Sequence, residues 1–162
     1  MNAVEIQGLT KRYGAITAVD SLDLTVRQGE LFALLGVNGA GKTTTIKMLS
    51  CLTRPDGGDA RLLGRSIVSD AAGALGLEPI LARRAGKLSG GWQRRLSIAM
   101  ALIARPEILF LDEPTLGLDV LARAELWDVV RQLKGRITVI LTTHYLEEAE
   151  ALSDRVGIMK DG

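Results

Sequence analysis

The stretch that decides the fold is residues 31–43, which read LFALLGVNGAGKT. Its first five residues form a continuous apolar run, as expected for a strand that is covered on both faces in a parallel sheet. The next eight carry three glycines and end in lysine and threonine, and a helix is predicted over about residues 42–52. A buried strand, a glycine-rich loop and a helix in this order predict an α/β fold.

The glycine-rich loop has the composition of a phosphate-binding site. Glycines permit positive φ and let backbone N–H groups face an anion without a Cβ in the way, and the N-terminus of the following helix adds partial positive charge. The lysine is predicted to reach the β- and γ-phosphates and the first threonine hydroxyl to ligate Mg²⁺. We therefore predict binding of ATP or GTP through Gly36, Asn38, Gly39, Gly41, Lys42, Thr43 and Thr44. The alternative is a glycine turn that only precedes a helix.

Two adjacent carboxylates follow a second apolar run, residues 108–111, which is predicted to be a strand. Ligands of open parallel sheets bind at the carboxyl ends of the strands. Asp112 is therefore predicted to hold Mg²⁺ through water, and Glu113 to act as the general base that polarises an attacking water. The alternative is a pair of surface acids at a strand end.

The remaining pattern predicts one domain with two kinds of sheet. Residues 3–6 and 21–26 have the composition or alternation of short antiparallel strands, and residues 60–63 form another short strand. Beyond residue 89 helices and strands alternate: a helix that ends before Pro106, a strand over 108–111, a helix over 121–133, a strand over 137–141, a helix over 144–152 and a strand over 155–159. This order predicts an α/β P-loop NTPase core, with a mostly parallel sheet flanked by helices, plus a small N-terminal antiparallel β part.

Composition narrows the classes of function. The chain has 162 residues and a formal net charge of +1, so there is no electrostatic case for nucleic acid as a partner. Its longest apolar stretch, residues 98–104, is far shorter than the roughly 20 residues needed to span a bilayer. Any membrane role is therefore expected to come through a partner chain. The single cysteine, Cys51, is expected to be a small buried residue.

A third motif, LSGGWQ at residues 88–93, opens another predicted helix. Alone, it could be a serine N-cap followed by flexible glycines. With two arginines after it and the Asp112 strand beyond, it resembles the signature motif of ATP-binding-cassette (ABC) proteins. The resemblance implies that Ser89, Gly90 and Gly91 grip the γ-phosphate of an ATP on a second ATP-binding subunit. A head-to-tail dimer with two sandwiched nucleotides is then expected.

Other segments are similar to ABC proteins as well. Tyr13 looks like the aromatic residue that stacks on adenine, although a tyrosine that packs against a strand end is the alternative. The TLGLD of residues 115–119 resembles the D-loop, through which the two subunits sense each other's nucleotide sites, and Asp119 is expected to belong to the nucleotide site. His144 matches the switch histidine, which contacts the γ-phosphate and orients the catalytic base, Glu113. Residues 143–150 look most like ATP-binding subunits of the ABC-2 type exporter class.

The resemblance also implies a reaction, ligands, a partner and a location in the cell. The chain would be the cytoplasmic motor subunit of an exporter, with ATP and Mg²⁺ as its ligands and ATP hydrolysis as its reaction. It would lie on the inner face of the plasma membrane, bound to a membrane-spanning transporter subunit. A soluble ABC protein that acts on nucleic acid or ribosomes is disfavoured, because the sequence has no second cassette, basic patch or coiled-coil insertion.

The sequence departs from the family between the phosphate loop and the signature. Only 23 residues, 65–87, separate the end of the first half of the chain from the signature, and no glutamine lies between Thr43 and Ser89. The family places a glutamine-bearing loop and a helical subdomain there, so we expect a single ABC-type domain over residues 1–162 that is shortened at about 65–87. Family members also usually continue beyond residues 160–162. A second hypothesis follows: a remnant that binds ATP without productive hydrolysis or transport coupling.

Overall fold

Two sheets of four strands each form the framework of this computed structural model, which describes residues 1–69, 90–103 and 105–162. The first sheet is parallel, in the order β6-β7-β3-β8. Its strands are β3 (Leu31–Leu35), β6 (Ile108–Asp112), β7 (Thr138–Thr143) and β8 (Arg155–Ile158). The first apolar run thus forms an internal strand, as predicted, because it lies between β7 and β8.

The second sheet is antiparallel, in the order β2-β1-β4-β5. It consists of β1 (Asn2–Tyr13), β2 (Ile16–Arg27), β4 (Gly57–Leu62) and β5 (Arg65–Ser66). The antiparallel part is larger than predicted, since β1 and β2 pair along a long hairpin. It is also not confined to the N-terminus, because β4 pairs with β1 and brings in residues that follow the phosphate loop.

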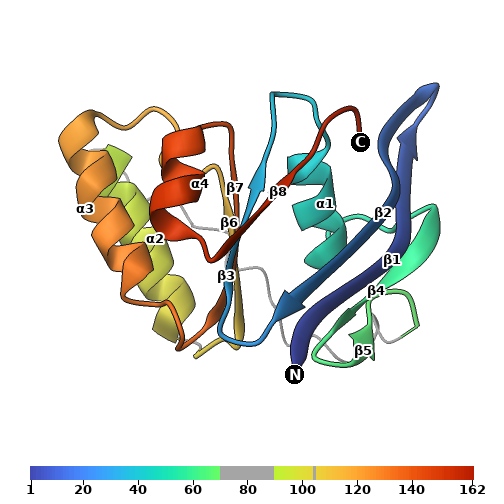
Figure 1. Cartoon of the computed structure of the whole chain (residues 1–162), viewed down its shortest axis with the longest axis horizontal. Helices are drawn as coiled ribbons and strands as arrows, with labels where there is room; N and C mark the ends of the chain where they lie inside the picture. The colour runs from blue at the N-terminus through green and yellow to red at the C-terminus, as the bar shows by residue number, and fades with distance from the viewer. Residues whose placement is uncertain (70–89, 104) are drawn as a thin grey trace.

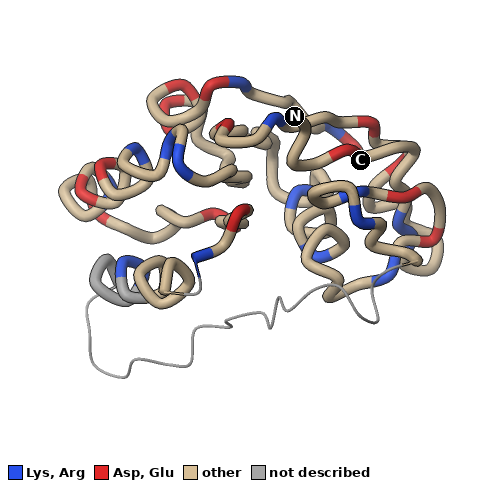
Figure 2. The backbone as a smooth tube through the Cα atoms, turned by 90° about the horizontal axis from the view of Figure 1, so that it is seen from below, with Lys and Arg blue, Asp and Glu red and all other residues tan. Residues whose placement is uncertain are grey.

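The helices divide the molecule into layers (Figure 1). Helix α1 (Lys42–Leu49) lies between the two sheets, while α2 (Gly90–Ile103), α3 (Val120–Arg131) and α4 (Leu146–Leu152) lie on the opposite side of the parallel sheet. Figure 2 shows acidic and basic residues interspersed along the described backbone. The parallel sheet flanked by helices and the antiparallel sheet beside it form an α/β fold, as predicted.

The β3 strand supplies side chains to two hydrophobic cores. Phe32 and Leu34 pack on the side of α1 and the antiparallel sheet, whereas Leu31 and Ala33 pack on the side of α2, α3 and α4. Side chains of a strand alternate between its two faces. A strand that is covered on both faces therefore needs apolar residues at every position, which explains the uninterrupted run in the sequence.

The end of α1 and the start of α4 differ from the prediction. Helix α1 ends at Leu49, about three residues early, because Cys51 has a positive φ of 57° and the Ser50 hydroxyl bonds back to the Ile46 carbonyl. Helix α4 begins at Leu146, so His144 lies in the turn that precedes it. Cys51 itself is partly buried against the first core, and burial raises the pKa of its thiol.

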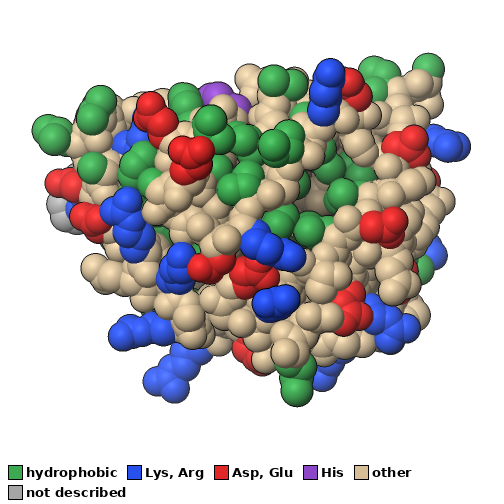
Figure 3. All heavy atoms as spheres, viewed as in Figure 1, with side chains coloured by type: hydrophobic (Ala, Val, Ile, Leu, Met, Phe, Trp, Pro, Cys, Tyr) green, Lys and Arg blue, Asp and Glu red, His purple; other side chains and the backbone are tan. Residues whose placement is uncertain are grey.

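Exposed apolar side chains are unevenly distributed. In Figure 3, hydrophobic side chains gather over the upper part of the face shown. Figure 1, in the same view, places the carboxyl end of β3 toward that upper side. None of the described helices combines the length and the apolar character that crossing a membrane requires.

Candidate nucleotide site

The candidate site lies where the parallel strands β3 and β6 end and α1 begins. A cavity of about 440 Å³ opens there, within the size range of small-molecule sites. Most of the residues predicted from the phosphate loop and the carboxylate pair line it, together with three that were not predicted: Ala18, Asn38, Gly39, Gly41, Lys42, Thr43, Thr44, Arg94, Asp112, Glu113 and Leu116. The carboxyl ends of neighbouring parallel strands thus bring the first two motifs together.

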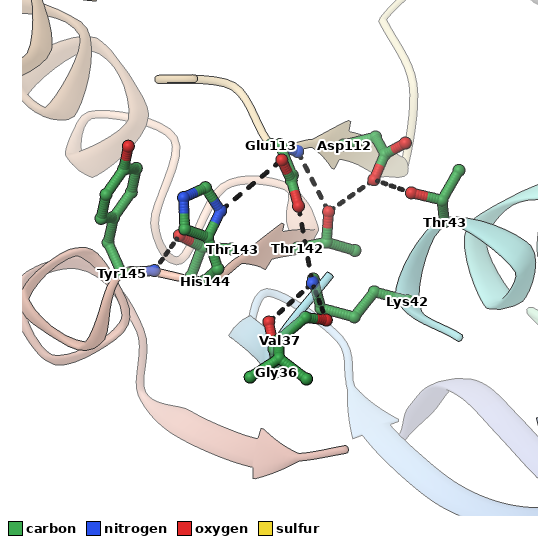
Figure 4. A network of polar contacts seen from close by, with 10 residues as sticks. All are labelled: Gly36, Val37, Lys42, Thr43, Asp112, Glu113, Thr142, Thr143, His144 and Tyr145. Atoms are coloured by element: carbon green, nitrogen blue, oxygen red, sulfur yellow. Dashed lines mark hydrogen bonds and ion pairs between the residues drawn. The ribbon is translucent and has the colours of Figure 1, made fainter. Parts of the chain in front are cut away.

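Lys42 is held at the base of this cavity, with only 4% of its side chain exposed. Its Nζ donates hydrogen bonds to the carbonyl oxygens of Gly36, at 2.7 Å, and Val37, at 3.0 Å. The same Nζ lies 3.5 Å from Oε1 of Glu113 (Figure 4). The loop therefore curls around the ammonium group and aims it at the strand ends.

Gly41 shows why this loop requires glycine. Its φ is 99°, which L side chains rarely adopt, and a Cβ at this position would overlap the carbonyl oxygen of Ala18. Any side chain here would push the loop away from β2.

Three oxygen-bearing side chains meet beside α1. The Thr43 hydroxyl donates to Oδ1 of Asp112 at 3.1 Å, and the Thr142 hydroxyl donates to the same oxygen at 2.6 Å. The backbone N–H of Glu113 in turn donates to Oγ1 of Thr142 at 3.0 Å. Thr142 therefore fixes both acidic residues, and it is a site residue that the sequence analysis did not select.

This oxygen set suits Mg²⁺. Magnesium is usually bound by one or two carboxylates together with phosphate oxygens and water, and the Thr43 hydroxyl and the Asp112 carboxylate lie side by side at the cavity. Within residues 1–69, 90–103 and 105–162, no three or more His, Cys, Asp and Glu side chains form a metal-binding cluster. A metal at this position would therefore take most of its ligands from a bound nucleotide and from water.

Glu113 has a strained backbone. Its φ is 45°, a conformation that costs a residue with a side chain on the order of 1 kcal/mol or more. Hydrogen bonds from its N–H to the carbonyl and hydroxyl oxygens of Thr142 hold it there. The conformation places the carboxylate between two basic groups, with Oε1 toward Lys42 and Oε2 3.6 Å from Nδ1 of His144.

His144 approaches the carboxylate from the turn between β7 and α4. Figure 4 shows its imidazole between the Glu113 carboxylate and the ring of Tyr145, whose centroid is 4.0 Å away. Nδ1 is buried and has no hydrogen-bond partner within the described part of the chain. Packing, rather than a hydrogen bond from Nδ1, therefore sets the orientation of this ring.

Other predicted site residues lie elsewhere. Tyr13, at the end of β1, is 48% exposed and does not line the cavity. Asp119 is the N-cap of α3, where its Oδ1 accepts a hydrogen bond from the N–H of Ala122 at 2.9 Å. Gly90 and Gly91 are the first residues of α2, as predicted, but Ser89 lies outside the described residues.

Arg94 is a cavity residue that sequence reasoning missed. It comes from α2 and lines the same cavity as Lys42 and the two acidic residues. The signal in the sequence was its position three residues after the glycine pair of the signature. Its contribution depends on how α2 packs beside β6, however, and the helical pattern of α2 does not reveal that packing.

The comparison with protein families decides what this arrangement is. The family model described as "ABC transporter" matches residues 19–73 and 65–116, which together make up more than half of the chain. The chain belongs to the ABC transporter family. The resemblance based on the motifs is thereby confirmed, and the sequence reasoning about the phosphate loop, signature and carboxylate strand identified the correct family.

Similar ABC proteins include ATP-binding subunits from bacteria. The chain is 38% identical to the daunorubicin/doxorubicin resistance ATP-binding protein DrrA of Streptomyces peucetius, over 99% of this chain and 63% of that protein. It is 36% identical to the Nod factor export ATP-binding protein I of Burkholderia lata, over 98% of this chain and 68% of that protein. The chain thus spans about two thirds of the length of these relatives. The DrrA alignment covers 208 residues, against 162 in the whole chain.

Solved structures agree on the fold. A nucleotide-free ATP-binding cassette from an ABC transporter superimposes with a TM-score of 0.85, covering 100% of this chain and 89% of that one at 20% identity. A dimeric ATP-binding cassette bound to ADP and Pi superimposes with a TM-score of 0.81, covering 98% of this chain and 95% of that one at 23% identity. At these identities the likeness establishes the ABC cassette fold.

Proposed function

We propose that this ABC domain binds ATP with Mg²⁺ and hydrolyses it as the cytoplasmic motor subunit of an exporter. The observation that carries the proposal is the convergence of Lys42, Asp112 and Glu113 on one cavity at the strand ends. A buried ammonium and two carboxylates at this position combine a phosphate-binding group, a metal ligand and a base. Hydrolysis of a nucleotide uses all three of these groups at one place.

Each side chain has a distinct role in this proposal. Lys42 and the N–H groups of the loop bind the phosphates, and Thr43 and Asp112 hold Mg²⁺, which neutralises phosphate charge when bound. Glu113 accepts the proton of the attacking water. His144, beside Oε2 of Glu113, orients that carboxylate and contacts the γ-phosphate.

A second ATP-binding subunit is part of the proposal. Large apolar side chains are exposed directly after the ends of three parallel strands, at Val37, Leu116 and Leu146, and Ile158 is 80% exposed at the end of β8 itself. These positions share the edge of the sheet that carries the nucleotide cavity, and Figure 3 shows hydrophobic side chains gathered in that region. A second copy packed head to tail would cover them and bring its Ser89, Gly90 and Gly91 toward the nucleotide.

The relatives support the cellular context. DrrA is named for drug resistance and the Burkholderia protein for Nod factor export. We propose by analogy that this chain works with a membrane-spanning subunit on the inner face of the plasma membrane. What such a complex would export is a property of that subunit.

One observation favours a second candidate function, a remnant that binds ATP without productive hydrolysis or coupling. No glutamine lies between Thr43 and Ser89, and the DrrA alignment is longer than the chain by more than forty positions. The two segments of the family match overlap at residues 65–73, consistent with the missing positions falling there. The phosphate loop and the carboxylate pair lie outside this interval, so binding and coupling are separable.

Phosphate release at increasing protein concentration tests the two candidates. An ATPase with a composite site should release phosphate at a rate per molecule that rises with concentration, and only with Mg²⁺ present. A chain that binds a fluorescent ATP analogue but releases no phosphate at any concentration supports the second candidate, a remnant that only binds ATP. A chain that does not bind the analogue contradicts the site assignment itself.

A further inference from the structure

A stack of three side chains joins His144 to the first turn of α3. The imidazole and the ring of Tyr145 lie 4.0 Å apart between centroids, tilted by 39°. The guanidinium carbon of Arg123 lies 4.5 Å from the centroid of the same tyrosine ring. A cation over an aromatic face within about 6 Å is attracted to it. The stack therefore connects the nucleotide site to a helix that does not line the cavity.

Little else holds the imidazole in place. Nδ1 of His144 and Nε of Arg123 are both buried, and neither has a hydrogen-bond partner in the described part of the chain. Tyr145 is better anchored, because its N–H donates to the Thr143 hydroxyl at 3.0 Å. The backbone of Tyr145 is thus held in place, and its ring contacts both the imidazole and the guanidinium.

The far end of the stack is fixed by the start of α3. The N–H of Arg123 donates to the carbonyl of Asp119 at 3.0 Å, and the Asp119 side chain caps the same turn. The place where α3 begins therefore determines where the guanidinium lies.

We propose that Tyr145 and Arg123 are positioning residues that hold the imidazole of His144 against Glu113. The proposal deepens the proposed function and rests on it, because it assigns a support to the group that orients the base. Neither residue touches the reacting atoms. Their removal lets the imidazole rotate away from Oε2, and a small misplacement of a catalytic group costs up to roughly 100-fold in rate.

Nuclear magnetic resonance tests the stack without requiring turnover. His144 is the only histidine in the sequence, so its carbon-bound ring protons give one pair of signals. In the parent, the ring current of Tyr145 should shift these signals away from their free-histidine positions. Tyr145→Leu should abolish the shift, Tyr145→Phe should preserve it, and Arg123→Ala should change it.

A matched control comes from the same helix. Arg131 lies with its guanidinium carbon 5.8 Å from the centroid of the Trp127 ring, a contact of the same kind at the other end of α3. Arg131→Ala should therefore leave the His144 signals as they are in the parent. Any general loosening of α3 would move them in both arginine variants, which would overturn the proposal.

Turnover completes the test. Arg123→Ala and Tyr145→Leu should lower kcat by roughly tenfold or more, with the affinity for a fluorescent ATP analogue unchanged and with recovery in Tyr145→Phe. Parental turnover in Arg123→Ala, or His144 signals in Tyr145→Leu that stay at their parental positions, overturns the positioning role. A parent that does not hydrolyse ATP contradicts the proposed hydrolysis, and the histidine signals then accept or reject the stack by themselves.

Discussion

Lys42 is the residue on which nucleotide affinity should depend most. Its ammonium is buried at the cavity, so Lys42→Ala removes the charged hydrogen-bond donor that the phosphate loop holds there. Hydrogen bonds to charged groups contribute about 1.5–3 kcal/mol, which corresponds to a loss of about 10- to 100-fold in affinity. Titration with a fluorescent ATP analogue measures it. Lys47→Ala, an exposed lysine of the same helix, is the control, and equal affinities in both variants would contradict the assignment.

Glu113 separates hydrolysis from binding. Glu113→Gln keeps the size of the side chain and its backbone hydrogen bonds to Thr142 but removes the base, so the rate of phosphate release should fall by about 10²- to 10⁴-fold. ATP should still bind. Glu107→Gln changes an exposed glutamate just before the same strand and should hydrolyse at the parental rate. A Glu113→Gln variant as active as the parent would remove this residue from the mechanism.

The sequence predicted those site residues that directly follow apolar strands. Asp112 and Glu113 could be assigned because the carboxyl ends of parallel strands meet at one edge of the sheet. Thr142 was missed as a site residue because its role depends on β6 lying beside β7, and strand order is not encoded in any local pattern. The position of Tyr13 likewise depends on the long β1–β2 hairpin rather than on the KRYG motif around it.

At the level of elements, Asp154 joins β8 to β3 and to the turn after α3. Its Oδ2 accepts a hydrogen bond from the N–H of Leu31 at 3.0 Å, and Oδ1 lies 2.7 Å from Nζ of Lys134. Burial raises the pKa of this carboxyl group, but the bonds from Lys134 and Leu31 lower it more, so the net pKa lies below the usual value. The carboxylate therefore stabilises the fold above its unfolded pKa, and this stabilisation is lost as pH falls through the folded pKa.

Asp154→Asn tests this link. The free energy of unfolding should decrease in the parent as pH falls below about 4, the ordinary pKa of aspartate. The variant should lose up to about 1 kcal/mol at pH 7, since the group is partly exposed, and should show a weaker decrease at low pH. Urea unfolding at pH 7 and at acid pH measures both. Asp128→Asn, which breaks an exposed pair with Arg131, should retain the parental pH profile.

The sequence predicted which segments are helices and which are strands better than it predicted the residues at which they begin and end. Helix and strand periods in the sequence identified every strand of the parallel sheet and every described helix, but not the two-residue strand β5. The helix ends differ from the prediction for local reasons that the hydrophobic periodicity of the sequence does not reveal. The left-handed backbone of Cys51 closes α1, and the bond from the Tyr145 N–H to the Thr143 hydroxyl delays the start of α4.

For the whole molecule, the apolar edge beside the cavity should control dimerisation. Ile158→Glu places a charge at the end of β8, so the rise of ATPase rate with protein concentration should be lost while ATP binding remains. Ile103→Glu is the control, because Ile103 is 81% exposed, nearly the same as Ile158, but ends α2 at the opposite edge of the sheet. If the two variants behave alike, the edge beside the cavity is not the dimer interface.

The shortened interval should affect transport rather than nucleotide binding. We propose that the interval at residues 65–87 lacks most of the helical subdomain that the family resemblance implies for docking onto a membrane subunit. We therefore expect the chain to bind ATP but to form no export-competent complex when it is co-expressed with an ABC-2 type membrane subunit. Co-purification and a cargo export assay measure this, with a full-length relative as the positive control. ATP-dependent export by the short chain would show that the interval is dispensable.

The burial of β3 on both faces has a consequence for local unfolding and amide hydrogen exchange. Its strand neighbours and both cores must separate before its amide hydrogens exchange with solvent, so β3 should open only when the whole domain unfolds. The phosphate loop begins directly after this strand. A ligand that binds only the folded loop stabilises the entire chain, by an amount that grows with the logarithm of its concentration. The lifetime of the domain in a cell would then follow the local supply of nucleotide.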